Sequence, residues 1–245
     1  MNKTIVSNKK IVMNKNKIKI EYFYFLIIIM YSFKYINKRI QKEICKQTIF
    51  LLNDQQLLPE YIKTKSVQNK IQHIVTILDK YKISSINQQN ITNELVNYII
   101  PSGTKGVIKG NKFNNIVKEY LLNINFDKSR YTLKFETKLL NISTINEIPD
   151  WYIYDNISRK YLIGMNQLDL WNGGHQLNRG YKYIHYNNIH LDHKIICVIC
   201  NHINISNKNK IYSLFNKGFT DNSICYLNNL QYIIINYFNN NDYKF

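Results

Sequence analysis

The segment 148–183 places acidic side chains close to a glycine break and a run of basic and amide side chains. Asp150 opens one apolar run, and Gln167 and Asp169 close a second one. A Gly-Gly pair at 173–174 then leads into a polar segment. That segment carries Gln176, Asn178, Arg179 and Lys182. Acids beside the basic start of a helix are residue types that hold a divalent metal against a phosphate group.

The two apolar runs have the lengths of β-strands, and this explains how the acids would meet. Side chains alternate between the faces of a strand, so Gln167 and Asp169 share one face. If the runs are neighbouring strands, both residues reach Asp150 across the pair. Mg²⁺ takes hard oxygen ligands and keeps several waters, so two carboxylates and one carbonyl suffice. We expect Asp150 and Asp169 to be metal ligands and Gln167 to supply a carbonyl or to position water.

The polar segment after the glycines predicts a helix over 176–184. Gln176, Arg179 and Tyr183 are spaced to share one of its faces. The free N–H groups of its first turn favour an anion, and Arg179 can bind phosphate through two hydrogen bonds. A surface helix with ordinary charges is the alternative.

The charge of the chain favours a polyanionic partner. Its 245 residues include 33 Lys and Arg against 16 Asp and Glu, a formal net charge of +17. Phosphate contacts dominate the affinity of such proteins for nucleic acid. The Asn, Lys, Ile and Tyr content is typical of an AT-rich genome, so part of the lysine excess reflects composition. The four cysteines form no dense framework and no secretory signal is evident, which predicts an intracellular protein of the cytoplasm or nucleus.

The chain divides into three parts by composition. Residues 1–20 form a basic arm, residues 21–100 a helical region and residues 101–245 an α/β domain. The run Tyr22–Phe33 is shorter than the roughly 20 residues of a spanning helix. We therefore expect a buried core helix and no stable membrane association; a membrane-anchored helical protein is the competing hypothesis.

Within the helical region, apolar spacing predicts a helix to about Leu58, which Pro59 ends. A second helix is predicted over Val67–Tyr81. Residues 84–90 read as a polar connection, after which Thr92 caps a further helix.

Glycine punctuates the chain from Pro101 onward. Gly103, Gly106 and Gly110 alternate with Lys105 and Lys109. The order of residues is not that of a phosphate-binding P-loop. The spacing predicts a loop that enters a helix, and its lysines either lie along a DNA backbone or belong to a plain loop.

The remaining elements follow from periodicity. Residues 111–122 read as a helix whose only acid is Glu119. Strands are predicted over 131–140, 151–154, 160–170 and 194–201, and apolar segments over 211–219 and 227–238 close the core. The pattern predicts a mixed α/β fold with a central mixed sheet flanked by helices.

The order helix, three strands, helix, strand, with Pro149-Asp150 opening the second strand, resembles the PD-(D/E)XK nuclease superfamily. The resemblance covers about residues 101–201. More narrowly, SGTKGVIKGNKFNNIVKEYL, IPDWYIYD and LIGMNQLDLWNGGHQLNRGYKYI are similar to a group of type II restriction endonucleases. It implies a restriction-endonuclease-like core and a Mg²⁺-dependent endonuclease that cuts double-stranded DNA, often as a homodimer. It also implies that Glu119 supports a metal-bound water.

The chain departs from this family at the third strand. The family has an acid, any residue and a lysine there. Aligned directly after the apolar run, these positions fall on Gly164 and Asn166; aligned later, they fall on Gln167 and Asp169. Neither alignment supplies the lysine, for which Lys182, Arg179, Lys160 and Lys105 are the substitutes. A catalytically inactive DNA-binding protein on the same fold is the alternative function.

Cys197 and Cys200 have the spacing of a zinc half-site, and three histidines lie near them in the sequence. Because residues three apart on a strand point to opposite faces, the pattern favours a buried structural strand instead.

Overall fold

The structure is a computed structural model, and it describes residues 33–34, 38–139, 142, 147–168, 182–185, 192–200 and 212–239. The basic arm 1–20 and the apolar run up to residue 32 lie outside these ranges. So do four predicted site residues: Asp169, Gln176, Asn178 and Arg179.

Four helices follow one another in the N-terminal region: α2 (Lys38–Leu51), α3 (Asp54–Ile62), α4 (Lys65–Lys80) and α5 (Ser85–Ile99). The predicted end of a helix at Pro59 is wrong, because Pro59 lies inside α3. The break comes earlier, where the Asn53 side chain accepts a hydrogen bond from the Gln55 N–H and caps α3. The predicted connection at 84–90 is also wrong, since α5 starts at Ser85 and includes Thr92.

Helix α6 (Ser102–Asn123) corrects the predicted glycine loop. Gly103, Gly106 and Gly110 are all helical, and a Cβ at any of them would meet nothing within 4 Å. The glycines thus form an open strip along the first half of α6. On another side of this half, Lys105, Lys109 and Lys112 form ion pairs with Asp54 and Glu60 of α3.

The central sheet has five strands in the order β3-β4-β5-β6-β7. They are β3 (Tyr131–Phe135), β4 (Trp151–Asp155), β5 (Lys160–Gln167), β6 (His193–Ile199) and β7 (Ile224–Tyr226). The first three strands pair antiparallel, while β5, β6 and β7 pair parallel. A separate two-residue pair joins β1 (Phe33–Lys34) to β2 (Asn125–Phe126). The predicted mixed α/β class is confirmed.

Both faces of the sheet are buried, as the near-continuous apolar runs of β5 and β6 require. On one face, residues such as Leu162 and Val198 join a core with α6 and with α9 (Leu230–Asn239). On the other face, Ile163 and Cys197 pack with Tyr183 and Ile184 of the helical residues 182–185. Helix α8 (Tyr212–Thr220) and the short helix η1 (Leu227–Asn229) flank β7.

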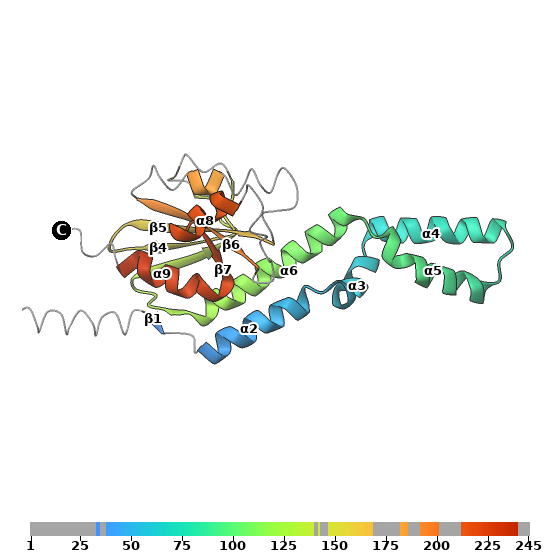
Figure 1. The fold of residues 1–245 in the computed structure, drawn as a ribbon, viewed down its shortest axis with the longest axis horizontal. Coiled ribbons are helices and arrows are strands. Elements are labelled where there is room, and N and C mark those ends of the chain that lie inside the picture. The colour runs from blue at the N-terminus through green and yellow to red at the C-terminus, as the bar shows by residue number, and fades with distance from the viewer. Residues whose placement is uncertain are drawn as a thin grey trace, which may run out of the picture.

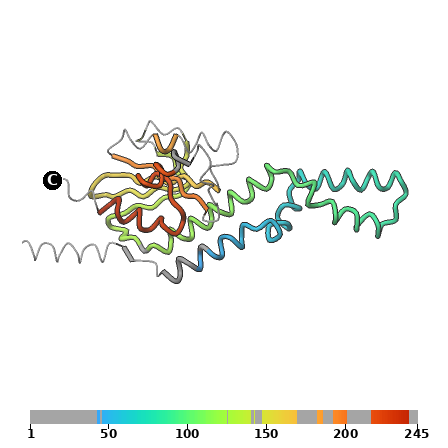
Figure 2. The backbone as a smooth tube through the Cα atoms, in the orientation of Figure 1, coloured from blue at the N-terminus to red at the C-terminus, as the bar shows by residue number. Residues whose placement is uncertain are grey.

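The molecule is elongated, with the sheet at one end and the α4–α5 hairpin at the other (Figure 1). Helix α6 runs from the hairpin to the sheet, as the green stretch of the backbone shows (Figure 2). Among the residues that the structure describes, no helix has the length and apolar character needed to cross a membrane.

Candidate active-site cleft

A cleft of about 420 Å³ opens between α6 and the adjoining ends of β4 and β5. Its polar lining comes from α6, from the approach to β4 and from the end of β5. The polar lining residues are Asn111, Asn114, Glu147, Asp150, Asn166 and Gln167. Gly106 and Gly110 lie on its wall, so the open glycine strip of α6 faces this space.

Asp150 is held at the start of β4 by two elements. Its Oδ1 accepts a hydrogen bond from the Asn114 Nδ2 of α6 at 2.9 Å, and its Oδ2 accepts one from the backbone N–H of Asn166 at 2.6 Å. The Asn166 Nδ2 in turn donates to the Asn114 Oδ1 at 3.2 Å. A carboxylate that accepts two amide donors is fixed in orientation.

The first alignment of the third-strand motif places its acid at position 164, where the structure leaves no room for a side chain. Gly164 pairs with Trp151 across β4 and β5, and a Cβ there would lie 1.8 Å from the Trp151 Cε2. The indole therefore occupies the space that a side chain at 164 would need. Trp151 donates from Nε1 to the Asn166 Oδ1 at 3.1 Å. This hydrogen bond orients the Asn166 side chain, which stands where the same alignment would place the lysine.

The predicted residues are only partly brought together. Asp150 and Gln167 both line the cleft, but the β5 residue that hydrogen-bonds the Asp150 carboxylate is Asn166. Glu119 is exposed on α6, and the lining of the cleft does not include it. Glu119 follows Asn114 by five residues. On an α-helix this places the two side chains about 140° apart around the axis, so Glu119 does not share the side of α6 that carries Asn114. The assignment of Asp169 falls outside the described residues.

A second carboxylate, Glu147, was not predicted and lines the same cleft. Its Oε1 accepts from the Lys182 Nζ at 2.9 Å, and its Oε2 accepts from the Tyr183 hydroxyl at 3.4 Å. The ion pair is half-exposed, with 50% of Lys182 and 39% of Glu147 accessible. A pair in that setting contributes little to stability. It places a lysine beside the cleft.

The two lysines predicted to contact DNA, Lys105 and Lys109, face α3 instead of a loop. Their Nζ atoms lie 3.6 Å and 2.8 Å from the carboxylate of Asp54. Lys109 lowers the pKa of Asp54 through this hydrogen bond, against the opposing effect of burial. About a third or less of each lysine side chain is exposed, at 31% and 28%. Part of their charge is therefore neutralised within the protein.

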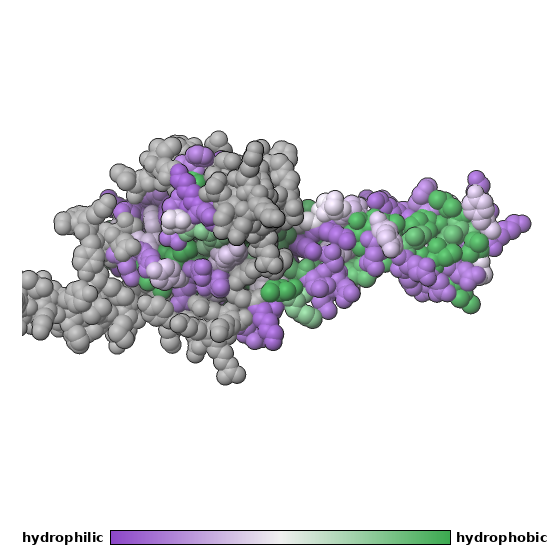
Figure 3. Space-filling view, viewed as in Figure 1, coloured by the Kyte–Doolittle hydropathy of each residue, from purple (hydrophilic) through white to green (hydrophobic). Residues whose placement is uncertain are grey.

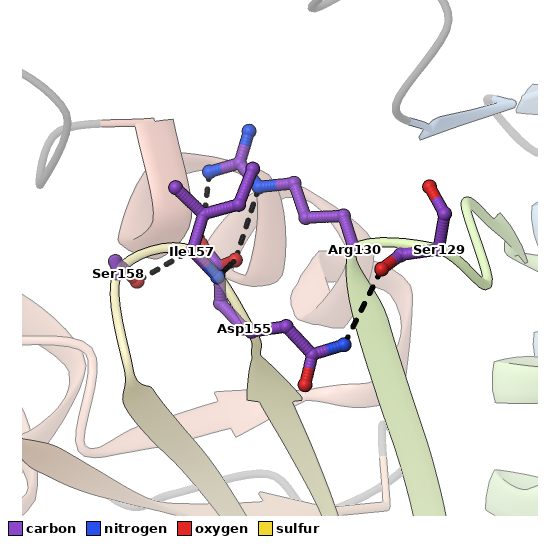
Figure 4. A network of polar contacts seen from close by, with 6 residues as sticks. Ser129, Arg130, Asp155, Ile157 and Ser158 are labelled. Carbon is purple, nitrogen blue, oxygen red and sulfur yellow. Dashed lines mark hydrogen bonds and ion pairs between the residues drawn. The ribbon is translucent and has the colours of Figure 1, made fainter.

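A second acid of β4, Asp155, has a structural environment at the opposite end of the strand (Figure 4). It is fully buried and accepts hydrogen bonds from Arg130 Nε at 3.1 Å and Nη2 at 2.8 Å. The Ile157 N–H and the Ser158 hydroxyl donate to it as well. These donors lie just before β3 and in the turn after β4, at the end of β4 remote from Asp150. Asp155 is therefore not one of the residues that line the cleft.

Cys197 and Cys200 are buried in β6 and just after it, as the strand prediction requires. Cys197 packs in the core on one face of the sheet and Cys200 in the core on the other. Burial raises the pKa of the Cys197 thiol well above its usual range. In the part of the chain that is described, no group of three or more His, Cys, Asp or Glu residues could hold a metal ion.

Asn114, Glu147 and Asn166 are the site residues that sequence reasoning missed. Asn114 interrupts the buried stripe of α6 between Phe113 and Val117, and Asn166 interrupts the apolar run of β5. A polar residue inside such a stripe needs a partner when buried, and this was the available signal. Glu147 precedes the strand by several residues and carries no such signal.

Comparison with models of known families, with curated proteins and with solved structures gives no match for this chain.

Proposed function

We propose that the protein is a Mg²⁺-dependent endonuclease of double-stranded DNA, of type II restriction character, with its active site in the Asp150 cleft. The observation that carries the proposal is the position of two carboxylates, Asp150 and Glu147, on the wall of one open cleft in a chain of charge +17. A basic protein attracts DNA, and the cleft offers acids where a scissile phosphate can be held with a metal.

The donor set of the cleft fits Mg²⁺. The carboxylates of Asp150 and Glu147 and the amide of Gln167 supply hard oxygen atoms among the lining of one cleft. Protein sites for this ion often use one or two carboxylates, and waters and substrate phosphates complete the shell. Bound there, Mg²⁺ would polarise the phosphate and lower the pKa of an attacking water.

The chain's own residues position these groups. Asn114 and the Asn166 N–H hold the Asp150 carboxylate in one orientation. Lys182, paired with Glu147, is the cation that we assign in place of the missing third-strand lysine. The open glycine strip on α6 leaves room for a bulky polymer to approach the cleft, because no side chain projects from Gly106 or Gly110.

The topology supports the same proposal. An antiparallel run β3-β4-β5 continues through the helical residues 182–185 into the parallel strand β6, with α6 before it. This is the order of elements that the resemblance to PD-(D/E)XK nucleases implies. Asp150 opens the second strand of that order, where the family carries its first acid.

One observation favours a second candidate, a DNA-binding protein without catalysis. Both oxygens of Asp150 accept hydrogen bonds from asparagine groups, and Gly164 has no room for a second strand acid. A site with its carboxylate satisfied in this way is stable without a metal. The two candidates predict the same affinity for DNA and opposite results in a cleavage assay.

The decisive experiment is cleavage of supercoiled plasmids of varied sequence by the full chain with Mg²⁺ or Mn²⁺. We expect divalent-dependent cleavage that Asp150→Asn lowers by roughly 100-fold or more, the scale of loss for a group that acts directly on the reaction. Glu94→Gln, an exposed acid on α5, is the matched control and should cleave like the wild type.

DNA binding is measured beside cleavage, by electrophoretic mobility shift at two salt concentrations. Salt-sensitive binding without cleavage under either metal would overturn the nuclease proposal and establish the binding protein. Circular dichroism of Asp150→Asn shows whether a loss of activity reflects loss of fold.

A further inference from the structure

The α4–α5 hairpin buries very little of its own apolar surface. Along the two helices, only Val67 and Val96 are buried in the described structure. The inward stripe of α4, such as Ile71 and Leu78, is only half-buried. Two helices alone cannot enclose a core, whereas four helices can.

Part of the remaining apolar surface forms one continuous side of the hairpin, which we call the arm face. On the α4 side it comprises Ile77 and Tyr81, the residue that caps the C-terminus of α4, spaced i and i+4. On α5 it comprises Ile91, Leu95 and Tyr98, spaced i, i+4 and i+7. On each helix, the set is rotated in the same sense away from the residues that pack against the other helix. Because the two helices are antiparallel, the two sets therefore lie on the same side of the hairpin.

The arm face is strongly exposed. Tyr81 is 71% and Tyr98 is 86% exposed, and Ile77 and Leu95 are 43% and 39% exposed. Apolar surface is grouped over this end of the molecule in the space-filling view (Figure 3). Scattered apolar residues on a surface are ordinary, but a contiguous patch on a projecting element indicates an interaction site.

The α5 side of the hairpin carries little charge, whereas α4 carries Lys65, Lys70 and Lys80 against Asp79. Helix α5 contains no lysine or arginine, and Glu94 is its one charged residue. Lys70, on the same side of α4, donates to the Ile99 carbonyl at the end of α5 at 3.1 Å. In a chain of net charge +17, this is a surface where two copies can approach without strong repulsion.

We propose that the arm face docks against the arm face of a second copy of this chain, so that two hairpins form a four-helix bundle about a two-fold axis. The same patch on both partners is self-complementary, as a two-fold interface requires. In this bundle, the arm faces of both hairpins are buried against each other. This inference does not depend on the nuclease activity.

The test is the oligomeric state of the full chain, measured by sedimentation equilibrium across the micromolar range. We expect a dimer for the wild type. In Leu95→Lys/Tyr98→Lys, two charges enter the buried face, and the dissociation constant should rise by roughly 100-fold or more. Ile77→Lys, on the other helix of the face, should act in the same direction.

Ile86→Lys is the matched control. Ile86 is 74% exposed and precedes Leu95 by about two and a half turns of α5, which places it on the opposite side. This variant should remain dimeric. Circular dichroism confirms that all variants keep their helix content. A monomeric wild type, or dimers that both face variants leave as tight as the wild type, would overturn the proposal.

Discussion

The buried pair of Arg130 and Asp155 shows how a single carboxylate can fix two strand ends. Burial alone would raise the pKa of Asp155, but the hydrogen bonds from Arg130, the Ile157 N–H and Ser158 outweigh it and hold the pKa below 3.8. Asp155 is therefore charged in the folded protein at neutral pH. Its role is to join the start of β3 to the turn after β4.

We expect Asp155→Asn to lower the free energy of unfolding by about 3 kcal/mol at pH 7, because it leaves Arg130 buried without its counter-charge. Since the folded pKa is lowered, this stabilisation is present above the unfolded pKa and is lost as the pH falls below about 4. Urea unfolding at pH 7 and pH 3 measures it. The gap between variant and wild type should narrow at pH 3. Asp79→Asn, at an exposed acid of α4, serves as the control, and an equal gap at both pH values would contradict the charge argument.

Gly164 makes a prediction of its own. Gly164→Ala places a Cβ against the Trp151 ring, so the ring must move and its hydrogen bond to Asn166 is strained. We expect a loss of about 1–3 kcal/mol in stability, the usual cost of overpacking a core. Thermal unfolding measures this loss, and tryptophan fluorescence reports the displacement of the ring.

Gly103→Ala provides the comparison for that change. A Cβ at 103 meets nothing within 4 Å, and alanine favours a helix over glycine, so this variant should be as stable as the wild type or more so. Equal destabilisation by both substitutions would refute the steric explanation for Gly164.

At the same scale, the sequence singled out Asp150 and Gln167 but not Asn114 and Asn166, the two asparagines that hydrogen-bond Asp150. An acid after a proline at the start of an apolar run is visible in a sequence. Asn114 is separated from Asp150 by many residues, and its role follows only from the packing of α6 on β5. Side-chain partners of that kind depend on tertiary structure, which local pattern does not contain.

Among the elements, most strands were predicted to within a few residues, but the strand predicted over 131–140 is too long, because β3 ends at Phe135 and Glu136 has a positive φ of 47°. The period of two in β3 and the apolar runs of β5 and β6 mark strands unambiguously. The glycines of α6 suggested a loop, because glycine weakens a helix in isolation. In the structure the helix continues through these glycines, and the second half of α6 packs a buried apolar stripe into the core. Lys109 and Lys112 also pair with Asp54 and Glu60 of α3.

The boundary between α2 and α3 gives a test at the level of an element. Asn53→Ala removes the side-chain acceptor of the Gln55 N–H, and we expect a cost of about 1 kcal/mol, the usual value for such a cap. Chemical unfolding followed by circular dichroism measures it. Ser84→Ala is the control, because Ser84 precedes α5 without a side-chain capping bond. A cost at Ser84 that equals the cost at Asn53 would argue against the cap.

For the whole molecule, the sequence predicted a helical region over 21–100 followed by an α/β part. It did not predict that α4 and α5 project from the sheet (Figure 1). Amphipathic periodicity tells which side of a helix is buried, but not against which element. The apolar stripes of α4 and α5 have the same sequence pattern whether they pack on the sheet or on another chain.

Helix α6 is one continuous connection between the two ends of the molecule. At 22 residues it is about 33 Å long, and it is continuous from the base of the hairpin to the sheet. Its first half is tied to α3, while its second half carries the Asn114 amide that orients Asp150. Helix α6 thus connects the base of the hairpin, without a break, to the residue whose amide orients the Asp150 carboxylate.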